Sequence, residues 1–99
     1  MSAALRQTRY ADLCAEARLS IAPDEEVRAE RQWVKGSAEE QIRLSWWKHG
    51  RMVPRPASLS EAQLVALLER GIAEGVFTPF FLRQLLGVME RNAHALVQD

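Results

Sequence analysis

Helix start and stop signals in the C-terminal half constrain the fold of this chain more than any other feature. Gly75 follows a leucine-rich stretch and has the position of a helix-ending glycine. Thr78 and Pro79 then suit the N-cap and the first position of another helix. Because the connection between the two stretches is short, the pattern predicts an αα-hairpin over residues 60–97.

The same kind of signal predicts short helices in the N-terminal half. Pro23 suits the first turn of a helix, and the acids of Asp24–Glu26 complement the positive end of a helix dipole. Ser37–Glu40 and Ser58–Glu61 both match the capping-box pattern. No alternating run of β-branched residues indicates a strand. The predicted helices cover residues 3–19, 23–35, 38–49, 60–74 and 79–97.

These segments predict an all-α fold, a small bundle of four to five short helices that ends in a C-terminal αα-hairpin. We expect a single helical domain over residues 1–99, with N-terminal helices in 1–50 and a proline-containing connector over 51–59. A chain of 99 residues, 47% of them hydrophobic, can build one modest core. The last helix has a wider apolar arc than a surface helix needs, so it is either central to the bundle or also a subunit contact.

Composition bounds the class of protein. Cys14 is the single cysteine, so no intrachain disulfide can form, and without a signal-peptide pattern we expect a cytoplasmic protein. No apolar run approaches the ~18 residues of a membrane span, so we expect no membrane partner. Arginine outnumbers lysine, and alanine and leucine are abundant, which is typical of a bacterial protein from a GC-rich genome.

A basic, aromatic segment lies in the middle of a formally neutral chain. Residues 41–60 contain four cations and no carboxylate, whereas residues 1–40 contain six cations and eight acids, and residues 61–99 contain three and five. This distribution is more typical of a binding surface than of a catalytic site. The predicted partner-binding residues are Arg43, Trp46, Trp47, Lys48, His49, Arg51 and Arg55.

Two interpretations of this segment remain open. On a helix, Trp46 and Trp47 would point ~100° apart, so they would not face the same pocket. Either both pack against neighbouring helices, or one is partly exposed as a binding anchor of the kind enriched in interface hot spots. The cations, likewise, either pair with acids such as those of residues 24–30, bind a polyanion, or contact a protein partner.

Patterns for catalysis or metal binding are absent from the sequence. His49 and His94 are far apart, and neither has metal-ligand spacing. The chain has no phosphate-binding glycine loop, GxSxG elbow or CxxC motif, and Cys14 is interpreted as a small core residue. We therefore expect neither an enzyme nor a bound metal or cofactor. A helix-turn-helix over residues 60–97 is disfavoured, because residues 79–82 are apolar where base-reading side chains should lie.

The sequence thus predicts a small non-catalytic interaction protein, an adaptor, inhibitor or regulator that binds a larger macromolecular partner through the basic, aromatic surface. A protein partner is favoured because four cations are few for a polyanion. The alternative is a nucleic-acid-binding module that uses the Trp46–Arg55 segment, with bases stacked on tryptophan and phosphates on arginine. The wide apolar arc of the last helix also suits a homodimer. A third hypothesis is a purely structural subunit of an assembly that the hairpin alone mediates, with Leu86 and Met89 in the contact.

Overall fold

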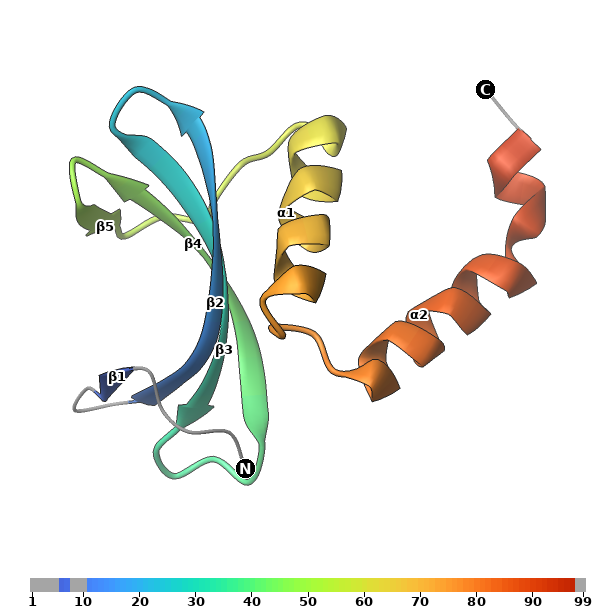
Figure 1. Ribbon diagram of the computed structural model, residues 1–99, viewed down its shortest axis with the longest axis horizontal. Helices are drawn as coiled ribbons and strands as arrows, with labels where there is room; N and C mark the ends of the chain where they lie inside the picture. The colour runs from blue at the N-terminus through green and yellow to red at the C-terminus, as the bar shows by residue number, and fades with distance from the viewer. Residues whose placement is uncertain (1–5, 8–10, 98–99) are drawn as a thin grey trace.

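One antiparallel sheet followed by helices forms the molecule (Figure 1). The computed structural model describes residues 6–7 and 11–97. Within these residues, five strands follow the chain order across the sheet, and each pairs antiparallel with the next. The elements are β1 (Arg6–Gln7), β2 (Ala11–Ala22), β3 (Glu25–Val34), β4 (Glu40–Lys48), β5 (Arg51–Val53), α1 (Glu61–Ala73), α2 (Pro79–Arg91) and the 3₁₀ helix η1 (Ala93–Val97).

The predicted all-α bundle is wrong. Where the structure describes the helices expected over residues 3–19, 23–35 and 38–49, it has strands β1 and β2, strand β3 and strand β4 with their connecting turns. Residues 3–5 and 8–10 of the first expected helix lie outside the described residues. The two C-terminal helices exist, but they do not pack side by side as an αα-hairpin, because α2 extends away from α1 (Figure 1).

The strands arise from a two-residue alternation that uses alanine and leucine more than β-branched residues. Successive side chains of a strand point to opposite faces, so this alternation gives the sheet one apolar face, here called the inner face, and one charged outer face. The inner face carries Ala15, Ala17, Leu19 and Ile21 of β2, Val27 and Ala29 of β3, and Ile42, Leu44 and Trp46 of β4. Alanine has a low strand propensity, so these strands lack the β-branched runs by which a strand is usually predicted.

A β-bulge in β2 produced the false helical pattern near the N-terminus. The register shifts between Leu13 and Ala15, so that the extra residue Cys14 is accommodated in β2. Leu13 and Cys14 are therefore both buried although they are neighbours. Two adjacent buried residues break the alternation of a strand and resemble one face of a helix.

The supposed helix starts are turns between strands. Pro23 and Asp24 connect β2 to β3, and Asp24 has a φ of 57°, so these residues do not open a helix. His49 and Gly50 connect β4 to β5 with φ of 52° and 76°, as in a type I′ turn. Ser37 lies in the β3–β4 connection, where its hydroxyl donates to the backbone carbonyl two residues later instead of capping a helix.

Helix α1 packs on the inner face of β2 and β3 and completes the core. Its N-cap is Ser60, which forms a reciprocal capping box with Gln63, two residues after the box expected at Ser58. Ala17 and Ala29 are small and almost fully buried, so the helix lies close to the sheet. The buried apolar cluster is Ala17, Val27, Ala29, Leu67, Val76 and Phe77.

The end of α1 is fixed by backbone hydrogen bonds and by one arginine. Gly75 ends the helix as predicted, with a φ of 73°. The Val76 N–H donates to the Gly71 carbonyl at 2.8 Å and the Gly75 N–H to the Ile72 carbonyl at 3.2 Å, which is a Schellman motif. Arg31 Nε of β3 donates to the Val76 carbonyl at 2.6 Å, so the sheet holds the loop that leads to α2.

Among the described residues, α2 packs against the body of the protein through its first turn. Thr78 is its N-cap and Pro79 its first residue, as predicted. The Phe81 ring lies against Phe77 with centroids 5.2 Å apart, and Leu82 packs on the core. No residue of α2 or η1 is buried, and both run away from the sheet (Figure 1). None of the described helices is long and apolar enough to cross a membrane.

Replacement of Gly71 by alanine tests the contact between α1 and Phe77. A methyl group at this position would overlap the Phe77 ring, which is itself buried. We expect Gly71→Ala to lower the free energy of unfolding in urea by about 1–3 kcal/mol, although alanine is the better helix former by about 1 kcal/mol.

Gly87→Ala in α2 is the matched control. An added methyl there meets only the flexible end of Arg91, at 3.1 Å from Nη1. We expect this variant to be neutral or slightly stabilising. Equal effects of the two substitutions would contradict the packing described here.

Candidate interaction surfaces

Strand β4 divides the predicted partner-binding residues between the two faces of the sheet. Trp46 lies on the inner face, paired with Val27, whereas Arg43 and Trp47 lie on the outer face, paired with Glu30 and Glu26. The two tryptophan side chains point in different directions, as expected. The cause is the alternation of side chains along a strand rather than the spacing of residues on a helix. The remaining predicted residues lie at or after the β4–β5 turn, and they are Lys48, His49, Arg51 and Arg55.

Trp47 is held within the fold on the outer face. The Arg28 guanidinium lies 3.6 Å from the centroid of the Trp47 ring, in cation–π geometry. The indole Nε1 of Trp47 donates to Ser45 Oγ at 2.8 Å. Arg28 is 5% exposed, so one face of the indole is covered by a buried cation.

A fully buried carboxylate, Glu30, is the centre of the outer face. Its Oε1 accepts from the Ser45 hydroxyl at 2.7 Å and from Arg43 Nε at 3.0 Å. Ser45 therefore links Trp47 to Glu30, because its oxygen accepts from the indole while its proton goes to the carboxylate. A buried carboxylate is costly unless it is paired and hydrogen-bonded, which makes this network a structural requirement.

Ion pairs cover the rest of the outer face. Arg18 Nη2 lies 2.8 Å from Glu16, and Arg28 Nη2 lies 2.8 Å from Glu26. The hydrogen bonds that Arg18 donates to the Glu16 carboxylate raise the pKa of Arg18. Together with Arg43, these cations are neutralised by acids of β2 and β3. The outer face thus has both signs of charge interspersed and is not a basic patch.

Trp46 lies at the edge of the core on the inner face. Its Nε1 donates to Glu25 Oε1 at 3.1 Å, and the Arg55 guanidinium lies 5.4 Å from its ring centroid. The ring packs against the buried cluster but is only partly buried itself. It lines a depression of about 160 Å³ together with Ile21, Pro56 and Ser58.

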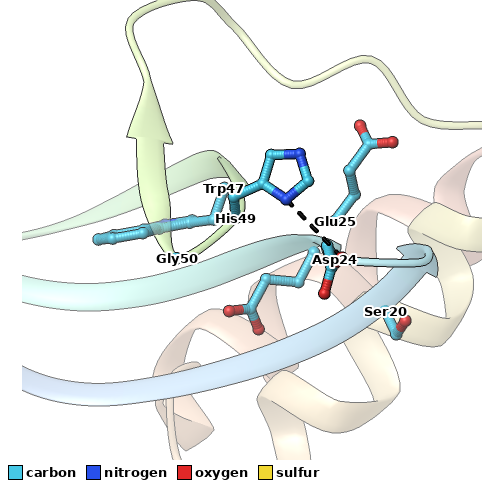
Figure 2. Close-up of a pocket in the computed structure, with 7 residues that line it drawn as sticks. Ser20, Asp24, Glu25, Trp47, His49 and Gly50 are labelled. Atoms are coloured by element: carbon cyan, nitrogen blue, oxygen red, sulfur yellow. Dashed lines mark ion pairs between the residues drawn. The ribbon is translucent and has the colours of Figure 1, made fainter.

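A pocket of about 330 Å³ lies beside the β2–β3 and β4–β5 turns (Figure 2). Its carboxylates are engaged: Glu25 accepts from Trp46, and Glu26 from Arg28. The His49 N–H donates to the Asp24 carbonyl at 2.8 Å, and the His49 ring nitrogen Nδ1 lies 3.7 Å from the Asp24 carboxylate. These contacts join the two turns. The lining residues are Ser20, Asp24, Glu25, Glu26, Trp47, His49 and Gly50.

Within the described part of the chain, three cations at or after the β4–β5 turn have no carboxylate partner. Among the described residues, no acid lies within ion-pair distance of Lys48, Arg51 or Arg55. Lys48 and Arg51 are register partners, so their charges lie close together at the tip of this hairpin. The basic part of the predicted surface is therefore smaller than the sequence indicated, and it is confined to these three residues.

Outside these surfaces, the described part of the chain has few side chains suited to catalysis or metal binding. No cluster of three or more His, Cys, Asp or Glu side chains there has an arrangement that could hold a metal ion. Cys14 is buried, and burial, with a smaller contribution from the charge of Glu40, raises the pKa of its thiol.

A second surface is apolar, and sequence analysis identified only part of it. The apolar face of α2, defined here as Phe81, Leu82, Leu85, Leu86, Val88 and Met89, is largely uncovered. Leu86 is 54% exposed, Val88 45% and Met89 46%. The wide arc of this helix gave the signal, and a subunit contact was one of its two interpretations.

A further apolar area, here called the inner flank, was not predicted. It consists of Ile42 and Leu44 on β4 and of Leu64 and Ile72 on α1, each 40% exposed or more. Arg70 of α1 donates to the Arg18 carbonyl on β2, which leaves Leu64 and Ile72 on the opposite flank of the helix. The alternation of residues 41–47 could have placed Ile42 and Leu44 on one face, had the segment been assigned to a strand.

Comparison of the chain with protein-family models, with curated proteins and with solved structures gives no match. The function is therefore inferred from the two surfaces themselves.

Removal of the Glu30 charge should be costly, because the carboxylate is 0% exposed and hydrogen-bonded on the outer face. We expect Glu30→Gln to lower the free energy of unfolding by about 3 kcal/mol, measured in urea by tryptophan fluorescence. The control is Asp24→Asn, since the Asp24 side chain is 73% exposed and asparagine tolerates its left-handed backbone, so the change should cost under about 1 kcal/mol. Similar losses for both variants would show that burial of the network is not what matters.

The thiol of Cys14 should react slowly in the native protein. Its raised pKa reduces the thiolate fraction at mildly alkaline pH, and its burial limits access of the reagent. We expect a chromogenic disulfide reagent to label Cys14 much faster after addition of urea. Labelling of the native protein at the rate of a free cysteine would contradict this placement of Cys14.

Proposed function

We propose that the protein is a small non-catalytic interaction protein, an adaptor, inhibitor or regulator, whose main contact is the apolar face of α2 together with the inner flank. One observation carries this proposal. Helix α2 has no extensive packing against another described element and buries no residue, although it presents Leu85, Leu86, Val88 and Met89 on one side.

Energetics favour a covered state for this helix. A helix of 13 residues is marginal in water unless its apolar face packs against something. Burial of a large aliphatic side chain is worth about 1.5–3 kcal/mol when the side chain starts fully exposed, hence about 1 kcal/mol for each half-exposed residue here. Exposed apolar patches can mark interaction sites on proteins.

The basic hairpin supports the alternative, a nucleic-acid-binding module that uses the Trp46–Arg55 segment. The observation in its favour is the set of cations Lys48, Arg51 and Arg55, whose charges are not neutralised by described residues. Against it, Trp47 is stacked under Arg28, so one face of this ring is not free for a base. We therefore place a protein partner first.

A capture experiment from lysate of the native host tests the proposal. Three tagged proteins are compared: wild type, a Leu86→Asp/Met89→Asp variant and an Arg51→Glu/Arg55→Glu variant, each with and without nuclease. We expect a second protein, or a differently tagged copy of this chain, to be captured by wild type and by the arginine variant. The apolar variant should lose at least nine-tenths of it, since two buried charges are each costly.

Other outcomes separate the alternatives. Loss in the arginine variant, or on nuclease treatment, would transfer the function to the basic hairpin. In that case, binding to a single-stranded oligonucleotide should weaken with salt, with a log–log slope of about −0.7 per neutralised phosphate. Capture that is the same for all three proteins would contradict both surfaces.

A further inference from the structure

We propose that the partner of the α2 apolar face is a second copy of this chain, and that the two α2 helices pair in antiparallel orientation. This inference rests on the proposed function, because it names the partner of the same surface. It follows from the spacing of the apolar residues, from the charges that flank them and from the absence of cover on α2.

The apolar face of α2 contains a seam that suits helix pairing. Leu82, Leu86 and Met89 are four and three residues apart, which is the spacing of the a and d positions of a heptad. Ala93 continues the spacing just after the helix. Leu86 and Met89 are about half exposed, so the middle of the seam is uncovered in the single chain.

Two opposite charges occupy equivalent positions beside this seam. Arg83 follows Leu82 and Glu90 follows Met89, so both are at the e position, on the same flank of the helix. They are seven residues apart, a rise of about 10.5 Å, which is too far for an ion pair within one helix. Among the described residues, neither side chain has an ion-pair partner in its own chain.

An antiparallel pair resolves both charges at once. In such a pair, the same flanks of the two helices meet. A two-fold axis beside Gly87 packs Leu86 against the partner's Met89 and puts Arg83 beside the partner's Glu90. The symmetric contact joins Glu90 to the partner's Arg83. A parallel pair would instead set the e positions against the g positions, Leu85 and Asn92, and would leave both charges unmatched.

The area of the contact between the two helices determines how stable we expect the dimer to be. A 13-residue helix is about 20 Å long, so one seam buries less than the ~800 Å² per partner of a standard interface. We therefore expect a dimer that dissociates on dilution. Leu96 and Val97 are 76% and 84% exposed. They lie beyond the seam and can add to the area that the dimer buries.

Sedimentation equilibrium of the full chain over a range of concentrations tests the pairing through charge exchange. Arg83→Glu puts two acids together on each side of the pair, and Glu90→Arg puts two cations together. Each variant alone should dimerise about tenfold more weakly than wild type, because two favourable contacts become repulsive. An equimolar mixture of the two variants should regain wild-type affinity as a heterodimer, and so should the double variant Arg83→Glu/Glu90→Arg.

Leu86→Asp is the second test, since it should abolish the dimer while unaltered far-UV circular dichroism and tryptophan fluorescence show that the sheet and α1 remain folded. A wild-type chain that is monomeric throughout, or single variants that are not rescued by mixing, would overturn the proposed pairing. If the chain is monomeric but still captures a different protein in a Leu86-dependent manner, the proposed function holds and only this inference fails.

Discussion

The width of a single helix is the constraint on which the rest of the structure depends. An α-helix with its side chains is about 10–12 Å across, and neighbouring strands are about 4.8 Å apart, so one helix covers about two strands. Helix α1 covers β2 and β3, where Ala17 and Ala29 let it lie close to the sheet. The inner face of β4 is left with Ile42 and Leu44 at 40% and 48% exposure.

The two faces of the sheet are completed in different ways as a result. The outer face is closed by pairs of opposite charge around the buried carboxylate of Glu30, and its cations and acids neutralise one another. The inner face lacks a second helix beside α1, because α2 leaves the body after its first turn (Figure 1). Solvent-exposed apolar surface is therefore concentrated on the inner face and on α2. We propose that a partner binds there.

The sequence predicted the features that depend on neighbouring residues. It did not predict the features that depend on contacts between residues distant in the chain. Thr78, Pro79 and Gly75 act on backbone groups within a few residues, so both C-terminal helices could be located. The strands could not, because alanine-rich alternation and the bulge at Cys14 resemble a helical pattern. The burial of Glu30 depends on Ser45, 15 residues away and on another strand, so no local pattern indicates it. The arc of α2 did indicate a contact surface, but not that the helix projects.

Hydrogen–deuterium exchange across α2 tests the central claim, that this helix is covered by a partner rather than left in water. Our account predicts that the amides of residues 83–91 exchange slowly at high protein concentration and much faster on dilution, while the amides of β3 do not change. Slow exchange in α2 that is independent of protein concentration would contradict the proposed self-association. Fast exchange at every concentration, with or without host lysate, would contradict the proposed interaction surface itself.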